Sequence, residues 1–288
     1  MREIQRLSSC SAVITYGHGH AIPLAESPVI SHFPLYSLAS KATILPAKDI
    51  PVPADKFLAA FGESWEKALK EGRAVNALDA CKIFECNAQK LDDAWNKAEK
   101  VVKFGGGFYC GLVSMKGKPD LYVFNAFFMT MRSKFVEPGT SIHCYEVQWS
   151  PSKLSWDAFR NQVLGPTDPA DGPVGSLRKT ILEQWKELGL TAEPNKGDNG
   201  VHASASPFEG LAEKINWLEK KVPEDPFGAA LLKAGLSATT IKEWSVDPRV
   251  TMPDGSKGSI FDALEDMNAG DCLAKLVELN GLNEGDEI

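Results

Sequence analysis

The chain has 288 residues, of which 43% are hydrophobic and 24% are charged, a balance typical of a folded globular protein. Its net charge of -7 argues against a protein that binds the nucleic-acid backbone, because such binding needs a basic surface. No run of about 18 apolar residues is present, and the six cysteines form no CxxC pair, so we expect a cytoplasmic protein with free thiols and neither a zinc site nor a disulfide framework.

The N-terminal third of the sequence predicts one strand, an irregular stretch and a helical region. Residues 10–16 (CSAVITY) are small or β-branched and end at a glycine, as a short buried strand does. Prolines recur over residues 17–53 without a sustained period, so we expect a loop or insertion there. Apolar residues at helical spacing then predict helices over residues 54–70, 74–84 and 91–102.

The middle of the chain alternates between strand and helix patterns. Residues 108–115 and 121–124 read as two strands, and the KGKPD turn between them predicts a hairpin. A short helix over residues 126–135 and a strand with alternating side chains over residues 138–149 follow, and residues 155–164 return to a helix. Because helices and strands do not alternate regularly, the pattern favours an α+β fold over a doubly wound sheet.

The segment from His202 to Glu213 contains the residues best suited to catalysis. Ser206 begins a helix as its N-cap, with a proline at the first position and Glu209 placed to close a capping box. Glu213 lies two turns along this helix and leans back towards His202 and Ser204. Such an arrangement suits a histidine nucleophile with an orienting acid. The alternative is a structural or surface histidine, which is the more frequent role of a single histidine near a helix start.

A turn and a further helix start precede this segment. Residues 164–169 (LGPTDP) favour a turn, and Ser176 begins the helix whose first turn contains Arg178. Free N–H groups and the helix dipole favour an anion at that position. The alternative is an ordinary solvated arginine.

These pieces, in order GPTDP, SLR, NGVHASAS and a glutamate eleven residues after the histidine, resemble the catalytic half of the nucleoside diphosphate kinases. That family has a GxTNP turn, a TIR segment and an NxxHGSDS motif whose histidine is phosphorylated. The resemblance is specific over residues 120–220. It implies that the phosphorylated residue is His202, supported by Ser204 and Glu213, and that phosphates and sugar are bound by Thr167, Arg178 and Asn199.

A weaker part of the resemblance lies upstream. Asn125-Ala126-Phe127-Phe128, followed by a short helix and a Pro-Gly strand, is similar to the family's base-binding helix and third strand. The resemblance therefore makes Phe127 a candidate base-stacking residue.

Two cationic residues of the family pattern are absent or displaced. Tyr16-Gly17-His18-Gly19 stands where the family has a KPDG motif with a phosphate-binding lysine, and we interpret Lys118-Pro119-Asp120 as a hairpin turn. Arg160 lies five residues before Gly165, whereas the family's arginine lies four before its glycine. A one-residue bulge would return Arg160 to the site, and Arg132 is the alternative.

The resemblance implies a ferredoxin-like antiparallel sheet within an α+β domain of residues 1–222. We expect a mainly helical insertion at about residues 45–104 and an accessory C-terminal extension over residues 223–288.

The implied reaction is ping-pong transfer of the terminal phosphate from ATP or another nucleoside triphosphate to a nucleoside diphosphate. Mg²⁺ would arrive with the nucleotide rather than in a metal site of the protein, and a homo-oligomer without nucleic-acid or membrane partners is expected. One alternative is a nucleotide-binding scaffold protein without turnover, which the missing lysine favours. Another is a histidine phosphotransferase or phosphohydrolase that passes the phosphate to a protein or to water.

Overall fold

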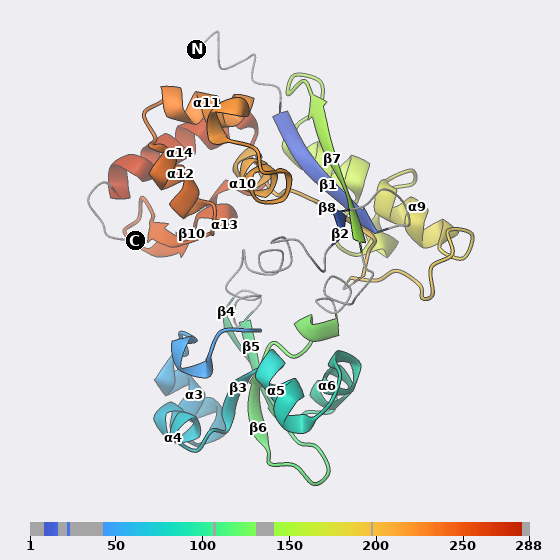
Figure 1. Cartoon of the computed structure of the whole chain (residues 1–288), viewed down its shortest axis with the longest axis vertical. Helices are drawn as coiled ribbons and strands as arrows, with labels where there is room; N and C mark the ends of the chain where they lie inside the picture. Colours follow the sequence, from blue (N-terminus) through green and yellow to red (C-terminus); the bar gives the residue numbers. More distant parts are fainter. Residues whose placement is uncertain are drawn as a thin grey trace. The chain divides into compact units, whose positions relative to one another are not determined.

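The computed structural model describes residues 9–16, 22–23, 43–105, 108–130, 141–196 and 198–283. The chain divides into two compact units, one formed by residues 1–29 and 141–288 and the other by residues 30–140 (Figure 1). Each unit combines helices with a sheet, so the α+β class predicted from the sequence is confirmed. None of the described helices has the length and apolar character needed to span a bilayer.

The first unit is built on a four-stranded antiparallel sheet in the order β2-β7-β1-β8. Its strands are β1 (Ser9–Tyr16), β2 (Ile22–Pro23), β7 (Ser141–Trp149) and β8 (Val201–Ala203). Counted along the chain, this is the order 2-3-1-4, the strand order of a ferredoxin-like sheet. Five residues, 17–21, separate β1 from β2 in the sequence, fewer than the dozen or so of a usual crossover between parallel strands.

The connection from β7 to β8 covers the sheet with short helical pieces. These are α8 (Trp156–Ala158), the π-helix η4 (Phe159–Leu164), the 3-10 turn η5 (Pro169–Asp171) and α9 (Leu177–Gln184). Phe159 and Leu164 of η4 pack with Val201 and Ala203 of β8 in a buried cluster. The helix predicted over residues 155–164 is therefore present, but its second half is wound more widely than an α-helix.

Helix α10 (Pro207–Leu218) lies between the sheet and the C-terminal helices (Figure 1). Ser206 begins it as predicted, and its hydroxyl accepts a hydrogen bond from the backbone N–H of Glu209 at 3.1 Å. The elements that follow are α11 (Pro226–Lys233), α12 (Ala238–Trp244), β9 (Arg249–Thr251), β10 (Lys257–Ser259), α13 (Ile260–Leu264) and α14 (Ala269–Asn283).

The C-terminal segment, residues 223–288, packs on the core as part of the first unit. Lys214 of α10 forms a buried salt bridge with Asp225, whose side chain also caps α11. A buried ion pair of this kind is costly to break from one side, because the remaining charge is left without a partner. This pair fixes the C-terminal helices to the helix that carries Glu213.

The insertion expected at about residues 45–104 is mainly helical, but it is part of the larger second unit, which contains a mixed sheet of its own. The strand order is β3-β6-β5-β4, and β3 runs parallel to β6. The strands are β3 (Ala74–Asn76), β4 (Val101–Gly105), β5 (Phe108–Val113) and β6 (Leu121–Phe124). The helices around them are η3 (Ala47–Asp49), α3 (Ala54–Phe61), α4 (Trp65–Lys70), α5 (Ala77–Phe84) and α6 (Ala88–Trp95).

Two predicted helices of this unit are shorter in the structure. The helix expected over residues 54–70 is interrupted at Gly62, which has a φ of 71° and ends α3. The one expected over residues 91–102 ends at Trp95, and its apparent last apolar position, Val102, belongs to β4. The predicted hairpin of β5 and β6 is confirmed.

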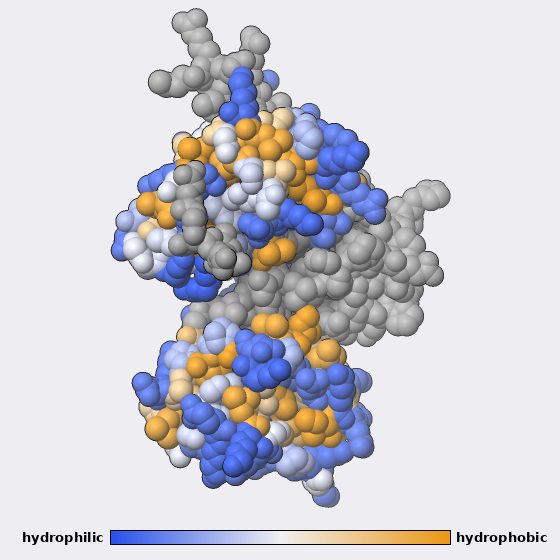
Figure 2. Space-filling view, turned by 60° about the vertical axis from the view of Figure 1, so that its left-hand side comes forward, coloured by the Kyte–Doolittle hydropathy of each residue, from blue (hydrophilic) through white to orange (hydrophobic). Residues whose placement is uncertain are grey.

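Helices cover both faces of this sheet, and alternate residues of β6 contact the helices on opposite faces. Tyr122 and Phe124 pack with Phe57 and Trp65 of α3 and α4, whereas Val123 packs with the residues of α5 and α6. All four residues of β6 are therefore buried, and its sequence shows no polar alternation. On the surface, apolar residues form patches among hydrophilic ones (Figure 2).

Candidate active site

His202 is held on β8, next to the central strand of the first sheet, where it pairs with Ile14 of β1. Its neighbours Val201 and Ala203 are buried in the core, and because side chains alternate along a strand, the imidazole lies on the opposite face. Its side chain is 36% exposed, and its Nε2 atom lies 2.6 Å from Oε1 of Glu213. The ring is thus reachable from solvent but fixed on one side.

Glu213 joins the histidine to a buried serine. Its side chain is 1% exposed, and its second oxygen, Oε2, accepts a hydrogen bond from the hydroxyl of Ser204 at 2.5 Å. A buried carboxylate is costly unless it is hydrogen-bonded, and the two donors meet this need. The bond from Nε2 to a carboxylate favours the neutral tautomer with its proton on Nε2 and its lone pair on Nδ1.

The charges around His202 favour its protonated form. The pKa of His202 is raised overall. Partial burial of the ring and the positive charge of Arg178 lower this pKa, but the negative charges of Glu213 and Glu209 outweigh both effects. Burial, together with the charge of Glu213, raises the pKa of Glu209 to about 7. Glu209 also accepts a hydrogen bond from the backbone N–H of Ala205, one residue before the position that the capping box predicts.

Arg178 is a cation without a carboxylate partner among the described residues. Its Nε and Nη2 atoms donate to the carbonyl oxygen of Val201 at 3.1 and 2.9 Å, and its Nη1 donates to that of Gly165 at 2.9 Å. Burial, and then the positive charge of Arg160, lower the pKa of Arg178 to about 10. A partly buried positive charge held only by neutral carbonyls, beside the residue that precedes His202, is suited to an anionic ligand.

The predicted residues Thr167 and Asn199 lie on neighbouring loops. The side-chain amide of Asn199 donates to the carbonyl oxygen of Thr167 at 3.1 Å. Thr167 is exposed, and the turn that contains it is held by the side chain of Asp168, which accepts from the N–H of Ala170 at 3.0 Å. The structure therefore brings these two residues together as the sequence predicts.

The π-helix η4 contains Arg160 and ends directly before Gly165. A π-helical turn is wider than an α-helical one and accommodates an extra residue, which fits the one-residue bulge that the resemblance requires. Arg160 lies close enough to lower the pKa values of both Arg178 and Glu209. Asn161, by contrast, bonds to Asp157 at 2.8 Å on the exposed side of the same segment.

The guanidinium of Arg160 is already paired with two carboxylates of the C-terminal segment. Its Nη1 atom donates to Oε1 of Glu265 at 2.9 Å and to Oδ1 of Asp266 at 2.5 Å. These carboxylates raise the pKa of Arg160, although burial acts in the opposite direction. The sequence did not indicate this contact, because the residues are more than a hundred positions apart and no local motif links them. The alternative, Arg132, lies outside the described residues.

Phe127, the predicted base-stacking residue, packs within an aromatic cluster. It belongs to the second unit, where it packs against Trp95, Tyr109 and Phe128, with ring centroids 6.0, 5.7 and 4.7 Å away. These contacts give Phe127 a packing role within its own unit, and its base-stacking assignment stays a prediction. The neighbouring Asn125 accepts a hydrogen bond from the backbone N–H of Tyr109 at 2.8 Å and continues the sheet.

The lysine that the family places after its first strand has no counterpart among the described residues of the site. Lys118 lies in the turn between β5 and β6, as predicted, and pairs with Glu85 at 3.2 Å. The sequence that follows Tyr16 lies outside the described residues.

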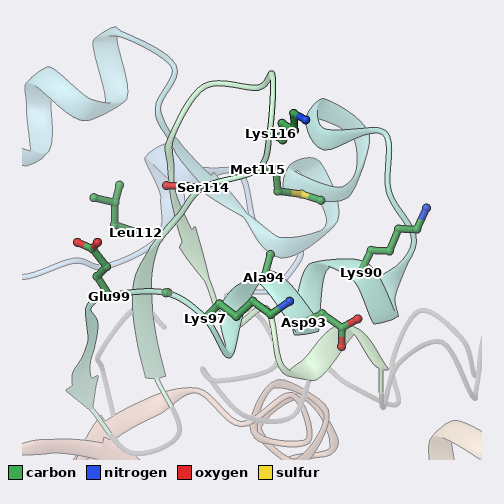
Figure 3. A pocket seen from close by; sticks show the side chains of 10 residues that line it. Lys90, Asp93, Ala94, Lys97, Glu99, Leu112, Ser114, Met115 and Lys116 are labelled. Atoms are coloured by element: carbon green, nitrogen blue, oxygen red, sulfur yellow. The ribbon is translucent and has the colours of Figure 1, made fainter.

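The second unit carries a hollow of about 420 Å³ (Figure 3). It is lined by residues of α6 and of the segments around it: Lys90, Asp93, Ala94, Lys97, Ala98, Glu99, Leu112, Ser114, Met115 and Lys116. Lys90 extends away from the hollow, and acidic and basic side chains both line it (Figure 3). This mixture of charges favours no particular class of ligand.

The chain matches no protein-family model, no curated protein and no solved structure. Its function is therefore inferred from the residues of the site themselves.

Proposed function

We propose that this chain transfers the terminal phosphate of a nucleoside triphosphate to a nucleoside diphosphate through a phosphohistidine on His202. The observation that carries the proposal is the bond of 2.6 Å from His202 to the buried Glu213, beside a positive charge on Arg178 that pairs with no described carboxylate. A fixed nucleophile next to an unmatched cation suits attack on an anionic phosphate.

The first step is attack by the neutral imidazole. The lone pair of Nδ1 forms a bond to the terminal phosphorus, while the bond from that phosphorus to the bridging oxygen breaks and the nucleoside diphosphate leaves with its electrons. The proton on Nε2 stays hydrogen-bonded to Glu213, which stabilises the positive charge that develops on the ring. In the second step a terminal oxygen of another diphosphate attacks the phosphorus, and the bond to Nδ1 breaks.

The remaining residues would position the phosphates. Phosphoryl transfer depends chiefly on positioning and on cations that neutralise the transferred group. Arg178 and Arg160 supply the two charges, and Thr167 and Asn199 present polar groups from adjacent loops. The substrate would be the complex of Mg²⁺ with the nucleotide.

A second candidate is a nucleotide-binding protein that has lost turnover and acts in interactions. Two observations favour it: the sequence Tyr16–Gly19 lacks the family's lysine, and Arg160 is already engaged by Glu265 and Asp266. Both reduce the positive charge available to a transferring phosphate. The two candidates differ in whether His202 becomes phosphorylated.

The test is incubation of the purified chain with γ-labelled ATP and Mg²⁺. The proposal predicts acid-labile, alkali-stable label on the chain, which is lost in His202→Ala and retained in His143→Ala, a matched variant on strand β7 of the same sheet. ATP binding without label would contradict the proposal and favour the second candidate.

A further inference from the structure

A turn between α13 and α14, residues 265–268, is fastened to the candidate active site. The backbone N–H of Asp266 donates to the carbonyl oxygen of Ala205 at 2.9 Å, and the side chain of Asn268 accepts from the backbone N–H of Trp156 at 2.9 Å. The indole N–H of Trp156 in turn donates to the carbonyl oxygen of Ser204 at 3.0 Å. The 265–268 turn is therefore tied to the same chain segment that carries His202.

Asp266 has a backbone conformation that is uncommon for its residue type. Its φ is 61°, in the left-handed region that disfavours most L-residues but that aspartate and asparagine adopt more readily. The bond to Ala205 holds this conformation and directs the carboxylate to Arg160.

The two carboxylates bind Arg160 at a single nitrogen. Both hydrogen bonds use Nη1, and within the described part of the chain Nε and Nη2 donate none. The side chain of Arg160 is 23% exposed, so part of it is open to solvent. A guanidinium is a planar fork, and fixing one nitrogen orients the others.

We infer that Asp266 is a positioning residue for phosphate binding, which holds Arg160 through Nη1 so that Nε and Nη2 can bind a phosphate of the nucleotide. The identity of that ligand rests on the proposed function. Glu265 has the lesser part, because its side chain is 51% exposed and surface ion pairs contribute little.

The alternative is a lid that competes with phosphate for Arg160. A lid has to release the arginine, whereas the 265–268 turn is held by hydrogen bonds at both Asp266 and Asn268 that do not involve Arg160. These bonds favour a permanent support, and the two roles predict opposite effects on affinity.

The experiment measures ADP affinity by isothermal titration calorimetry, which does not require phosphoryl transfer. Asp266→Gly removes the carboxylate without backbone strain, because glycine tolerates a positive φ. Asp266→Asn retains an oxygen acceptor, and Glu278→Gln, on the exposed part of α14, is the matched control. Arg160→Gln and the double variant Arg160→Gln/Asp266→Gly establish whether Asp266 acts through Arg160, and thermal unfolding checks that each variant is folded.

We expect Asp266→Gly to weaken ADP binding by about fivefold, as loss of one charge-assisted contact would. Asp266→Asn should lose less, Glu278→Gln should change affinity by less than about twofold, and the double variant should bind as weakly as Arg160→Gln alone. Unchanged or tighter binding by Asp266→Gly, a further loss in the double variant, or no ADP binding by the wild type would overturn the inference. ADP binding that follows the expected pattern in a chain that takes no label would refute the kinase proposal and leave this inference standing.

Discussion

Glu213 lies 2.6 Å from His202 although the two residues belong to different elements, the helix α10 and the strand β8. The N-cap Ser206 sets where α10 begins, and two helical turns then bring the carboxylate back over the strand. The nucleophile and its orienting acid are thus linked by the geometry of one capped helix.

Replacement of Glu213 by glutamine tests this link. The amide keeps the size of the side chain but removes its charge and can present an N–H to the ring, which favours the wrong tautomer. We expect the rate of labelling from γ-labelled ATP to fall by about 100-fold, with little change in ADP affinity. Glu278→Gln, on the exposed part of α14, is the control. A labelling rate within about twofold of the wild type would exclude an orienting role for Glu213.

The labelling rate should rise with pH. Only the neutral imidazole has a lone pair on Nδ1, and the pKa of His202 is raised by Glu213 and Glu209, so the ring stays protonated above its ordinary pKa of about 6.5. The ion pair of His202 with Glu213 therefore stabilises the fold fully at pH values below the pKa of His202 in the unfolded chain. This stabilisation is lost as the pH rises through the pKa of His202 in the folded protein. Rapid-quench labelling across neutral pH measures the midpoint.

Two variants separate the charges that set this midpoint. Glu213→Gln should move it to lower pH because the nearest negative charge is gone. Glu209→Gln should move it in the same direction by less, because Glu209 acts at longer range and titrates near pH 7 itself. A rate that is flat with pH, or a midpoint that neither variant lowers, would show that His202 is not the titrating group.

Arg178 should be needed for anion binding and transfer. We expect Arg178→Leu to reduce the labelling rate by about 100-fold and to weaken ADP binding, because the cation without a carboxylate partner is removed. The comparison variant is Arg249→Lys, an exposed arginine of the β9–β10 hairpin. Phosphate should also raise the melting temperature of the wild type and not that of Arg178→Leu. Equal phosphate stabilisation of both would place the anion elsewhere.

Phe127 should matter for stability and not for nucleotide affinity. Its ring is partly buried and packs against a core cluster of the second unit, so Phe127→Ala should lower the free energy of unfolding by about 2 kcal/mol, as measured in urea. ADP affinity should stay unchanged under conditions where the variant is folded. A selective loss of ADP affinity without loss of stability would support the base-stacking assignment.

The parts of the site that the sequence predicts are those that depend on local structure. The capped helix at Ser206, the spacing to Glu213 and the turn at Thr167 follow from residues close together in the chain, and the structure contains all three. The contact of Arg160 with Asp266 joins segments 106 positions apart, and no periodicity or motif encodes such a pairing.

In the fold, too, elements that depend on nearby residues were predicted, whereas pairings between residues far apart in the chain were not. Strand β1 and the β5–β6 hairpin were predicted because their apolar runs and turns are local signals. The three-residue strand β3 is buried throughout and has no alternation, so its pairing with β6 was not visible in the sequence. The second sheet was therefore predicted only in its β5–β6 hairpin.

The most direct test of the proposed reaction is transfer of the phosphate from the labelled chain to a second nucleotide. After incubation with γ-labelled ATP and removal of free nucleotide, unlabelled GDP is added and the products are separated. The ping-pong mechanism predicts that label leaves His202 and appears in GTP. Label that remains on the chain, or that is released only as inorganic phosphate, would contradict the nucleoside diphosphate kinase activity.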